Sequence, residues 1–187
     1  SNYVPWDYLR IKKKAVIKFA EVNSNLEITV DEIKKQITNK TKMIAITHLS
    51  NVTGGISPLD EIIELAKSKR IPVLIDGTQG APHLKIDVQK LDCDFYVISC
   101  HKMYGPNGLG ILYGKKKWLD LFEPYQGGGG MIGEVKKDKI TYAETPTKFE
   151  AGTMQTAEVV SFAESIRFIE NLGFKNISDH ENEIMNY

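Results

Sequence analysis

The chain has 187 residues, of which 42% are hydrophobic and 26% charged, and its 24 lysine and arginine residues balance its 24 aspartate and glutamate residues. Because this balance leaves no global field, we expect neither nucleic acid nor an anionic membrane surface as a partner. No apolar run approaches the ~20 residues of a membrane span and no charged and then apolar leader is visible, so we expect a soluble protein.

Cys93 and Cys100 are the only cysteines of the chain. Neither belongs to a C-x-x-C pair or to a Cys/His cluster with the spacing of a zinc site. The sequence therefore indicates a reducing compartment and no metal. The chain opens with Ser1 and stops within "SDHENEIMNY", which reads as a helix that is still running, so we expect a piece of a longer polypeptide.

The first 40 residues predict a helix, a strand and a second helix. Residues 4–14 have apolar side chains at helical spacing, and residues 15–22 alternate between apolar and polar as in a strand. A short helix is expected over residues 29–38, where Thr29 is the cap and Glu32 completes a capping box.

A buried strand and the strongest helix signal of the chain come next. Residues 42–47 form an apolar run that ends in polar residues. Residues 57–70 predict an amphipathic helix with Ser57 at the cap position and Pro58 in its first turn.

Three further strands and a long helix complete the pattern. Apolar runs at 71–75, 94–98 and 110–114 predict the strands, and residues 157–173 predict a helix that Gly173 stops. Continuous apolar strands separated by amphipathic helices indicate a mostly parallel sheet between helices. The predicted fold class is α/β.

In such sheets, functional residues gather at the carboxyl ends of the strands. Three predicted strands deliver polar residues there: His48, Ser50 and Asn51; Asp76, Thr78 and Gln79; and Ser99, His101 and Lys102. Other familiar motifs fail. Gly105 and Gly110 have the spacing of a phosphate-binding loop but precede Ile111 where a lysine is needed, and "HENEI" ends in Ile184 where a zinc protease needs histidine.

A lysine that follows a buried strand has a specific chemical use. Lysine is the amine nucleophile of carbonyl chemistry where its surroundings lower its pKa, and its best-known partner is the aldehyde of pyridoxal phosphate. That cofactor also needs a carboxylate at its ring nitrogen, a donor at its phenolic oxygen and polar groups at its phosphate. The candidates are Lys102 for the aldehyde, Asp76 for the ring nitrogen, Gln79 and Asn51 for the phenolic oxygen, and Ser99 and His101 for the phosphate.

Each of these residues also has a plainer interpretation. An aspartate that ends a strand is often a turn residue, a histidine there is often structural, and a lysine beside a Gly-Pro turn is usually solvated. Cys100 is either a small packed side chain or a thiol of low pKa near the phosphate. The prediction depends on the whole group, which stands in this order on consecutive strand ends.

The motifs around these residues resemble successive blocks of the class V aminotransferase family of pyridoxal-phosphate enzymes, and among them most the SUF-type cysteine desulfurases, which include selenocysteine lyase-like members. The blocks are "THLSNVTGG", "VLIDGTQGAPH", "LDCDFYVISCHKMYGPNGLGILYG", "PYQGGGGMI" and "FEAGT".

The resemblance implies the aspartate-aminotransferase-like fold, which is the fold type I of pyridoxal-phosphate-dependent transferases, and a homodimer with active sites at its interface. It implies that Lys102 forms the Schiff base, and it assigns the other residues as follows: Asp76 and Gln79 to the ring, Ser99 and His101 to the phosphate, and Asn51 to the vicinity of the cofactor. Thr153 matches the residue that reaches the phosphate of the neighbouring subunit's cofactor, and "YQGGGG" matches a segment near the same interface.

The implied reaction removes sulfur from L-cysteine and leaves L-alanine. An enzyme thiolate takes the sulfur as a persulfide, and a carrier protein collects it for iron–sulfur cluster assembly. The family's attacking cysteine and substrate-binding arginines lie in a C-terminal region beyond the residues matched here, and its ring-stacking histidine precedes them. We therefore interpret residues 1–173 as the central part of an incomplete cofactor-binding large domain and residues 174–187 as the start of a connection to a C-terminal domain. In isolation, these 187 residues are expected to bind the cofactor weakly and to lack turnover.

Two alternatives stay open. The chain could belong to another class V enzyme, such as a selenocysteine lyase, a kynureninase-like enzyme or an aminotransferase, or it could be a non-catalytic dimerisation module. The Lys-, Asn- and Ile-rich composition suits an AT-rich genome. We expect a cytoplasmic protein, or one of a plastid-like organelle if the source is eukaryotic.

Overall fold

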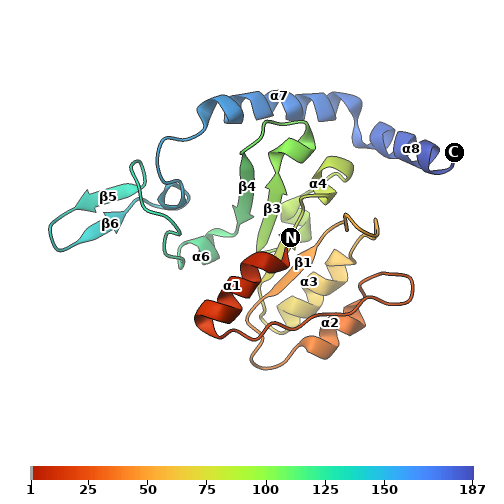
Figure 1. Cartoon of the computed structure of the whole chain (residues 1–187), viewed down its shortest axis with the longest axis horizontal. Coiled ribbons are helices and arrows are strands. Elements are labelled where there is room, and N and C mark those ends of the chain that lie inside the picture. The colour runs from red at the N-terminus through yellow and green to blue at the C-terminus, as the bar shows by residue number, and fades with distance from the viewer. Residues whose placement is uncertain (1) are drawn as a thin grey trace.

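A four-stranded sheet in the order β1-β2-β3-β4 lies at the centre of the molecule (Figure 1). The structure is a computed structural model and describes residues 2–187. Strands β1 (Ile44–Thr47), β2 (Val73–Asp76) and β3 (Phe95–Ser99) are parallel, and β4 (Gly110–Gly114) is antiparallel to β3. The expected α/β fold with a mostly parallel sheet is therefore confirmed.

One face of this sheet carries the hydrophobic core. Helices α2 (Val30–Gln36), α3 (Leu59–Ser68) and α5 (Val88–Leu91) contribute apolar side chains to it. Ile62 and Ile75 are fully buried there. Each such side chain stabilises the fold by roughly 1.5–3 kcal/mol relative to an exposed one, which explains why α3 forms where the amphipathic pattern predicts it.

The other face of the sheet is covered more thinly. Helix α1 (Tyr3–Lys13) has no buried residue, and its Trp6 lines an apolar pocket of about 240 Å³. Leu74 of β2 and Leu112 of β4 line the same pocket, and Leu112 is 54% exposed. The two faces of the sheet therefore differ strongly in how well they are buried.

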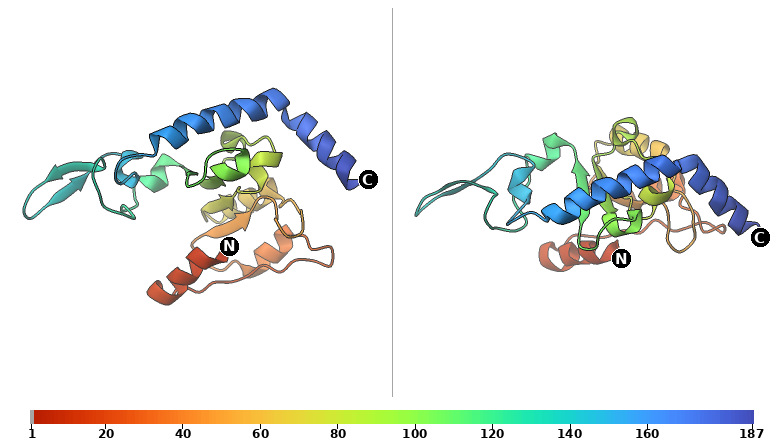
Figure 2. Two further views of the ribbon diagram at one scale, coloured as in Figure 1. Left: turned by 45° about the horizontal axis from the view of Figure 1, so that its top comes forward. Right: turned by 90° about the horizontal axis from the view of Figure 1, so that it is seen from above.

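The second half of the chain extends beyond the sheet. Helices α7 (Thr156–Leu172) and α8 (Phe174–Met185) follow each other across the top of Figure 1, and the hairpin of β5 (Ile132–Val135) and β6 (Ile140–Tyr142) projects at the end opposite α8 in both views of Figure 2. The short helices are α4 (Gly80–His83), η1 (Cys100–Met103), α6 (Lys116–Leu119) and η2 (Thr147–Phe149). No helix within residues 2–187 is both long and apolar enough to cross a membrane.

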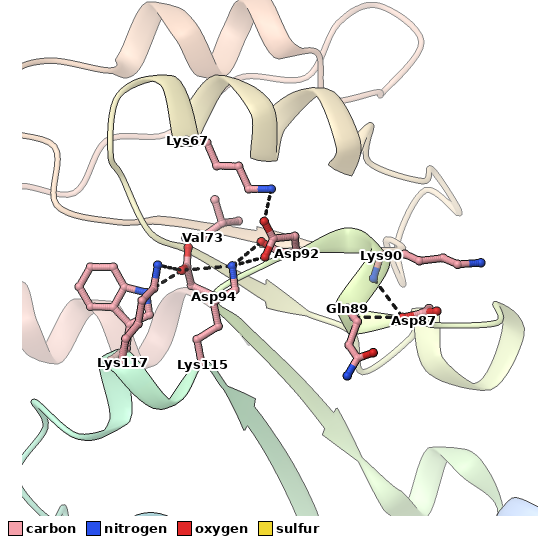
Figure 3. A network of polar contacts seen from close by, with 10 residues as sticks. Lys67, Val73, Asp87, Gln89, Lys90, Asp92, Asp94, Lys115 and Lys117 are labelled. Carbon is pink, nitrogen blue, oxygen red and sulfur yellow. Dashed lines mark hydrogen bonds and ion pairs between the residues drawn. The ribbon is translucent and has the colours of Figure 1, made fainter.

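A polar network fixes the sheet at the edge where the parallel strands begin (Figure 3). The carboxylate of Asp94 accepts hydrogen bonds from the Val73 N–H at 3.0 Å and from Nε1 of Trp118 at 2.6 Å. The Nζ of Lys115 lies 2.5 Å from Asp92, which also pairs with Lys67. This network joins β2, the start of β3 and helix α6, so it supports the sheet at the edge opposite the predicted site.

Two local predictions are wrong. Residues 15–22 form no strand, because they pair with no neighbouring strand, and Val16 is 84% exposed. Helix α3 begins at Leu59 with Pro58 as its N-cap, and the Ser57 hydroxyl does not cap the helix but donates a hydrogen bond to the Thr47 carbonyl oxygen at 2.7 Å.

Helix boundaries elsewhere agree with the sequence in part. Thr29 caps α2 by accepting a hydrogen bond from the Glu32 N–H at 3.3 Å, but the Glu32 carboxylate pairs with Lys35 and leaves the capping box half formed. Gly173, with φ of 77°, ends α7, and α8 starts at the next residue. The division between residues 1–173 and 174–187 coincides with this junction and stays a prediction.

Candidate functional site

The three parallel strands end side by side at one edge of the sheet. Thr47 pairs with Asp76, and Asp76 pairs with Val97, two residues before the end of β3. Past the strands, the His48 N–H donates to the Asp76 carbonyl oxygen at 2.9 Å, and the Gly77 N–H donates to the Val97 carbonyl oxygen at 2.8 Å. The three loops that carry the predicted site residues therefore leave the sheet as neighbours.

Asp76 and Ser99 lie on the same face of the sheet. Side chains alternate between faces along a strand, so Ser99 shares the face of Val97, which is the register partner of Asp76. Both residues are half-buried, and Oδ1 of Asp76 accepts a hydrogen bond from the Thr78 N–H at 3.1 Å. A carboxylate and a hydroxyl thus stand at adjoining strand ends and face one side.

Lys102 and His101 lie in η1, directly after β3, and both side chains are exposed. Backbone hydrogen bonds connect the segment that carries these two residues to the turn that follows it. The Cys100 N–H donates to the Leu109 carbonyl oxygen at 3.1 Å, and the Gly105 N–H donates to the Cys100 carbonyl oxygen at 3.0 Å. The Gly-Pro-Asn-Gly turn therefore holds the lysine at the end of the strand.

Helix α7 packs on this turn and explains its glycine. A Cβ at Gly105 would lie 2.5 Å from Cδ2 of Phe162 and 2.7 Å from the Cys100 carbonyl oxygen, so only glycine fits. The Ser165 hydroxyl donates to the Tyr104 carbonyl oxygen at 3.0 Å. The position of Lys102 in the fold thus depends on α7 as well as on β3.

Two ring side chains lie beneath the loop at 77–80: His48, which the sequence places at a strand end without a role, and Tyr96, which sequence reasoning missed. His48 and Tyr96 are 8% and 3% exposed, and His48 Nδ1 lies 2.8 Å from the Tyr96 hydroxyl oxygen. A Cβ at Gly77 would lie 1.9 Å from Cε1 of Tyr96, and one at Gly80 would lie 3.0 Å from the His48 ring. The two glycines in "DGTQG" were the available signal, because they mark a backbone that approaches other atoms closely.

Gln79, Asn51 and Thr153 have different surroundings. Gln79 is half-buried in the loop after β2, whereas Asn51 is exposed in the loop after β1. The Ser50 N–H donates a hydrogen bond to the Gly55 carbonyl oxygen at 2.9 Å across that second loop. Thr153 is exposed, beside Gly152. No side-chain hydrogen bond within residues 2–187 joins any of the three to Lys102.

The segments "YQGGGG" and "FEAGT" lie against each other. The Gly152 N–H donates to the Gly129 carbonyl oxygen at 2.8 Å, and a Cβ at Gly128 would lie 3.2 Å from the Gly152 nitrogen. Thr153 therefore belongs to a surface with residues 127–130. Tyr125, in the same segment, is 92% exposed.

Both cysteines are buried, and their pKa values are raised. Burial raises the pKa of Cys93 to about 11, and burial also raises the pKa of Cys100. A thiol of low pKa near the phosphate is therefore wrong for Cys100, which is a small packed side chain. Among residues 2–187, no cluster of three or more His, Cys, Asp or Glu side chains could hold a metal ion.

Comparison with known proteins connects this arrangement to one family. The aminotransferase class-V profile matches residues 1–187. A protein of Staphylococcus epidermidis named "probable cysteine desulfurase" is 46% identical over 187 residues, which are 100% of this chain and 45% of that protein. The chain thus spans less than half the length of this curated relative.

Two solved structures share the fold. The cysteine desulfurase CsdA of Escherichia coli, in its S-sulfonic acid form, superposes with a TM-score of 0.90 and 38% identity over 94% of this chain and 44% of that one. The apo cysteine desulfurase of Thermococcus onnurineus superposes with a TM-score of 0.91 and 33% identity over 98% and 46%. The sheet and its strand-end loops therefore have the architecture of part of these proteins.

Proposed function

The chain belongs to the aminotransferase class-V family, and on that premise we propose that it is the cofactor-binding part of a cysteine desulfurase. Pyridoxal phosphate is the cofactor of this family. The observation that carries the proposal is the position of Asp76 and Ser99 on one face of the sheet, at adjoining strand ends, with Lys102 three residues after Ser99.

The donor set fits this cofactor. Asp76 is half-buried and presents a carboxylate for the ring nitrogen, and the loop that follows carries the amide of Gln79 for the phenolic oxygen. Ser99 and His101 present a hydroxyl and an imidazole for the phosphate, and Lys102 presents the amine for the aldehyde. Asn51 completes the group from the loop after β1.

The bound cofactor supplies an electron sink that makes the substrate's α-proton acidic. Asp76 would keep a proton on the ring nitrogen, which would maintain that sink. Lys102 would hold the aldehyde, and its amine would be the group that moves protons at the substrate carbons. Ser99 and His101 would hold the phosphate and Gln79 the phenolic oxygen, which would fix the orientation of the cofactor relative to Lys102.

The thiol that accepts the sulfur is assigned to neither Cys93 nor Cys100. Both are fully buried, and burial raises the pKa of each thiol, so neither supplies a reactive thiolate. We place that thiol in a part of the enzyme outside these 187 residues, as the family resemblance implies. L-alanine and an enzyme persulfide are the products, and a carrier protein passes the sulfur to iron–sulfur cluster assembly.

A homodimer is part of the proposal. Thr153 is exposed on the surface that it forms with residues 127–130, and no side-chain hydrogen bond links it to the strand-end group of its own chain. In a homodimer, Thr153 would bind the phosphate of the cofactor held by the neighbouring subunit. Sedimentation with and without the cofactor tests the association.

The cofactor assignment is tested by absorbance on addition of pyridoxal phosphate. Wild type is expected to develop a band near the visible edge, and Lys102→Ala is expected to lack it. Lys69→Ala is the matched control, because Lys69 is an exposed lysine at the end of α3. An identical spectrum in wild type and Lys102→Ala rejects the assignment.

The reaction is tested separately in the longer enzyme. Incubation with L-cysteine is expected to yield alanine and, with a reductant, sulfide in equal amounts. Preference for L-selenocysteine would support the selenocysteine lyase alternative, transfer of the amino group to a keto acid would support an aminotransferase, and dimerisation without a cofactor band would support the non-catalytic module.

A further inference from the structure

A buried hydrogen bond lies directly beneath the loop that carries Asp76 and Gln79. His48 follows β1 and Tyr96 belongs to β3, yet His48 Nδ1 lies 2.8 Å from the Tyr96 hydroxyl oxygen. The two rings meet edge to face with their centroids 6.0 Å apart. The bond thus joins the two strands that flank β2, on the face of the sheet opposite Asp76.

The loop after β2 rests on these two rings at both of its glycines. Gly77 lies over the Tyr96 ring, where a Cβ would come within 1.9 Å of Cε1. Gly80 lies over the His48 ring, where a Cβ would lie 3.0 Å from Cγ and Nδ1. Thr78 and Gln79 lie between these two contact points, and Asp76 immediately precedes Gly77.

The backbone of His48 is fixed to the end of β2 and to the segment that precedes α3. Its N–H donates to the Asp76 carbonyl oxygen at 2.9 Å, and its carbonyl oxygen accepts from the Ser57 N–H at 2.9 Å. A displacement of His48 therefore shifts Asp76 through this backbone hydrogen bond. It also shifts Gly80, which contacts the His48 ring directly.

A neutral imidazole and a protonated phenol share this bond. Burial lowers the pKa of His48 and raises the pKa of Tyr96, so the imidazole is neutral and the phenol keeps its proton. The tautomer of His48 sets which of the two groups donates. In this arrangement the bond holds both rings in one geometry at neutral pH.

We propose that His48 and Tyr96 are positioning residues that set the loop at 77–80, and with it the Asp76 carboxylate and the Gln79 amide, for the ring of the cofactor. The inference rests on the proposed function, since it concerns the same site. Neither residue touches the cofactor, because both lie below the loop and are nearly inaccessible to solvent. Their effect passes through the backbone of residues 76–80.

The test uses Tyr96→Phe, which keeps the ring under Gly77 and removes only the hydroxyl. Pyridoxal phosphate is titrated into wild type and the variant, and both the dissociation constant and the absorption maximum of the Lys102-dependent band are measured. We expect affinity to fall about tenfold, which is the effect of losing one buried hydrogen bond. We also expect the maximum to move, because Asp76 and Gln79 tune the electrons of the ring.

Two variants of His48 provide a rescue experiment. His48→Asn keeps an amide that can accept or donate a hydrogen bond near the position of Nδ1, and it is expected to keep the wild-type absorption maximum and most of the affinity. His48→Leu removes the hydrogen-bonding group and is expected to behave as Tyr96→Phe does. Equal spectra and affinities for the Asn and Leu variants contradict the proposal.

A matched control separates positioning from stability. Ile33→Val shortens a core side chain that is 5% exposed and belongs to α2, an element that does not carry the loop at 77–80. It is expected to lower the unfolding midpoint and leave the absorption maximum in place. The inference on His48 and Tyr96 fails, while the proposed function stands, if Tyr96→Phe binds the cofactor as wild type does. It fails in the same way if Ile33→Val shifts the absorption maximum as much as Tyr96→Phe does. If wild type lacks a Lys102-dependent band, the proposed function itself fails.

Discussion

Asp76 and Ser99 occupy the same face of the sheet at neighbouring strand ends, because Asp76 pairs with Val97 and Ser99 follows Val97 by two residues on β3. This relationship depends on register. A slip of one residue between β2 and β3 would turn Ser99 to the opposite face. The buried contacts of Ile75 and Tyr96 with the core prevent such a slip, so core packing sets the geometry of the candidate site.

Gly77→Ala is expected to damage the candidate site. The added methyl group would lie 1.9 Å from the Tyr96 ring, so either the loop or the ring must move. We expect a loss of about 1–3 kcal/mol in the free energy of unfolding, typical of overpacking, together with weaker binding of pyridoxal phosphate. Urea unfolding and absorbance titration measure the two effects.

Gly127→Ala is the control for that substitution, because a Cβ at Gly127 meets no atom within 4 Å. It is expected to leave the unfolding free energy close to wild type. Equal losses of unfolding free energy for the two alanine substitutions would show that the contact with Tyr96 does not restrict the loop.

Asp94→Ala is expected to destabilise the sheet. The carboxylate of Asp94 is the acceptor for the Val73 N–H and for Nε1 of Trp118, and its side chain is 13% exposed. Removing it leaves two half-buried donors without their acceptor, which costs about 1–3 kcal/mol. Thermal and urea unfolding measure the loss. Asp138→Ala, in the exposed hairpin loop, is the control and is expected to change stability by no more than about 0.5 kcal/mol.

Acid is expected to weaken the network around Asp92 in a defined pH range. Hydrogen bonds from Lys115 and Lys67 lower the pKa of Asp92 from 3.8 to about 2. A depressed carboxyl pKa contributes stability above the unfolded pKa, and that contribution is lost as the pH falls from about 3.8 towards 2. The pair is exposed, so the effect is small and decreases with salt.

The measurement for Asp92 is the difference in urea midpoint between wild type and Asp92→Asn at several pH values. The difference is expected to be largest at pH 5 and to shrink towards pH 2. Because all other carboxyl groups titrate in both proteins, the difference isolates Asp92. A difference that is constant over this range would contradict the depressed pKa.

Both thiols are expected to resist modification in the folded protein. Cys93 and Cys100 are fully buried, and the pKa of Cys93 is about 11. A thiol reagent at pH 8 should therefore label neither cysteine in native buffer and both in concentrated urea. Rapid native labelling of Cys100, identified by peptide mapping, would restore the reactive-thiol interpretation.

The sheet could be predicted from sequence because its signals are local. Continuous apolar runs such as residues 71–75 specify buried parallel strands, and the amphipathic pattern after Pro58 specifies α3. Residues 15–22 show the limit of this reasoning. Their alternation matches a strand, but a strand also needs a neighbour to bond with, and the described chain offers none beside them.

The sequence could predict which strand ends carry the candidate site residues, but not the contacts that fix the loops after those strands. The alternation of apolar strands places Asp76, Ser99 and Lys102 at one edge, but the turn at Gly105 is fixed by Phe162 of α7, more than fifty residues later. The support of Gly77 and Gly80 by Tyr96 and His48 is equally non-local. The glycines mark a close approach of the backbone but do not identify the side chain that it approaches, so both contacts are absent from the sequence-based prediction.

The central claim is that Lys102 binds the aldehyde of pyridoxal phosphate, and the most direct measurement is reductive trapping followed by peptide mapping. Borohydride treatment of the protein with the cofactor is expected to leave one phosphopyridoxyl group, on the peptide that contains Lys102. Labelling spread over exposed lysines such as Lys69 and Lys117, with no enrichment at Lys102, would contradict the account.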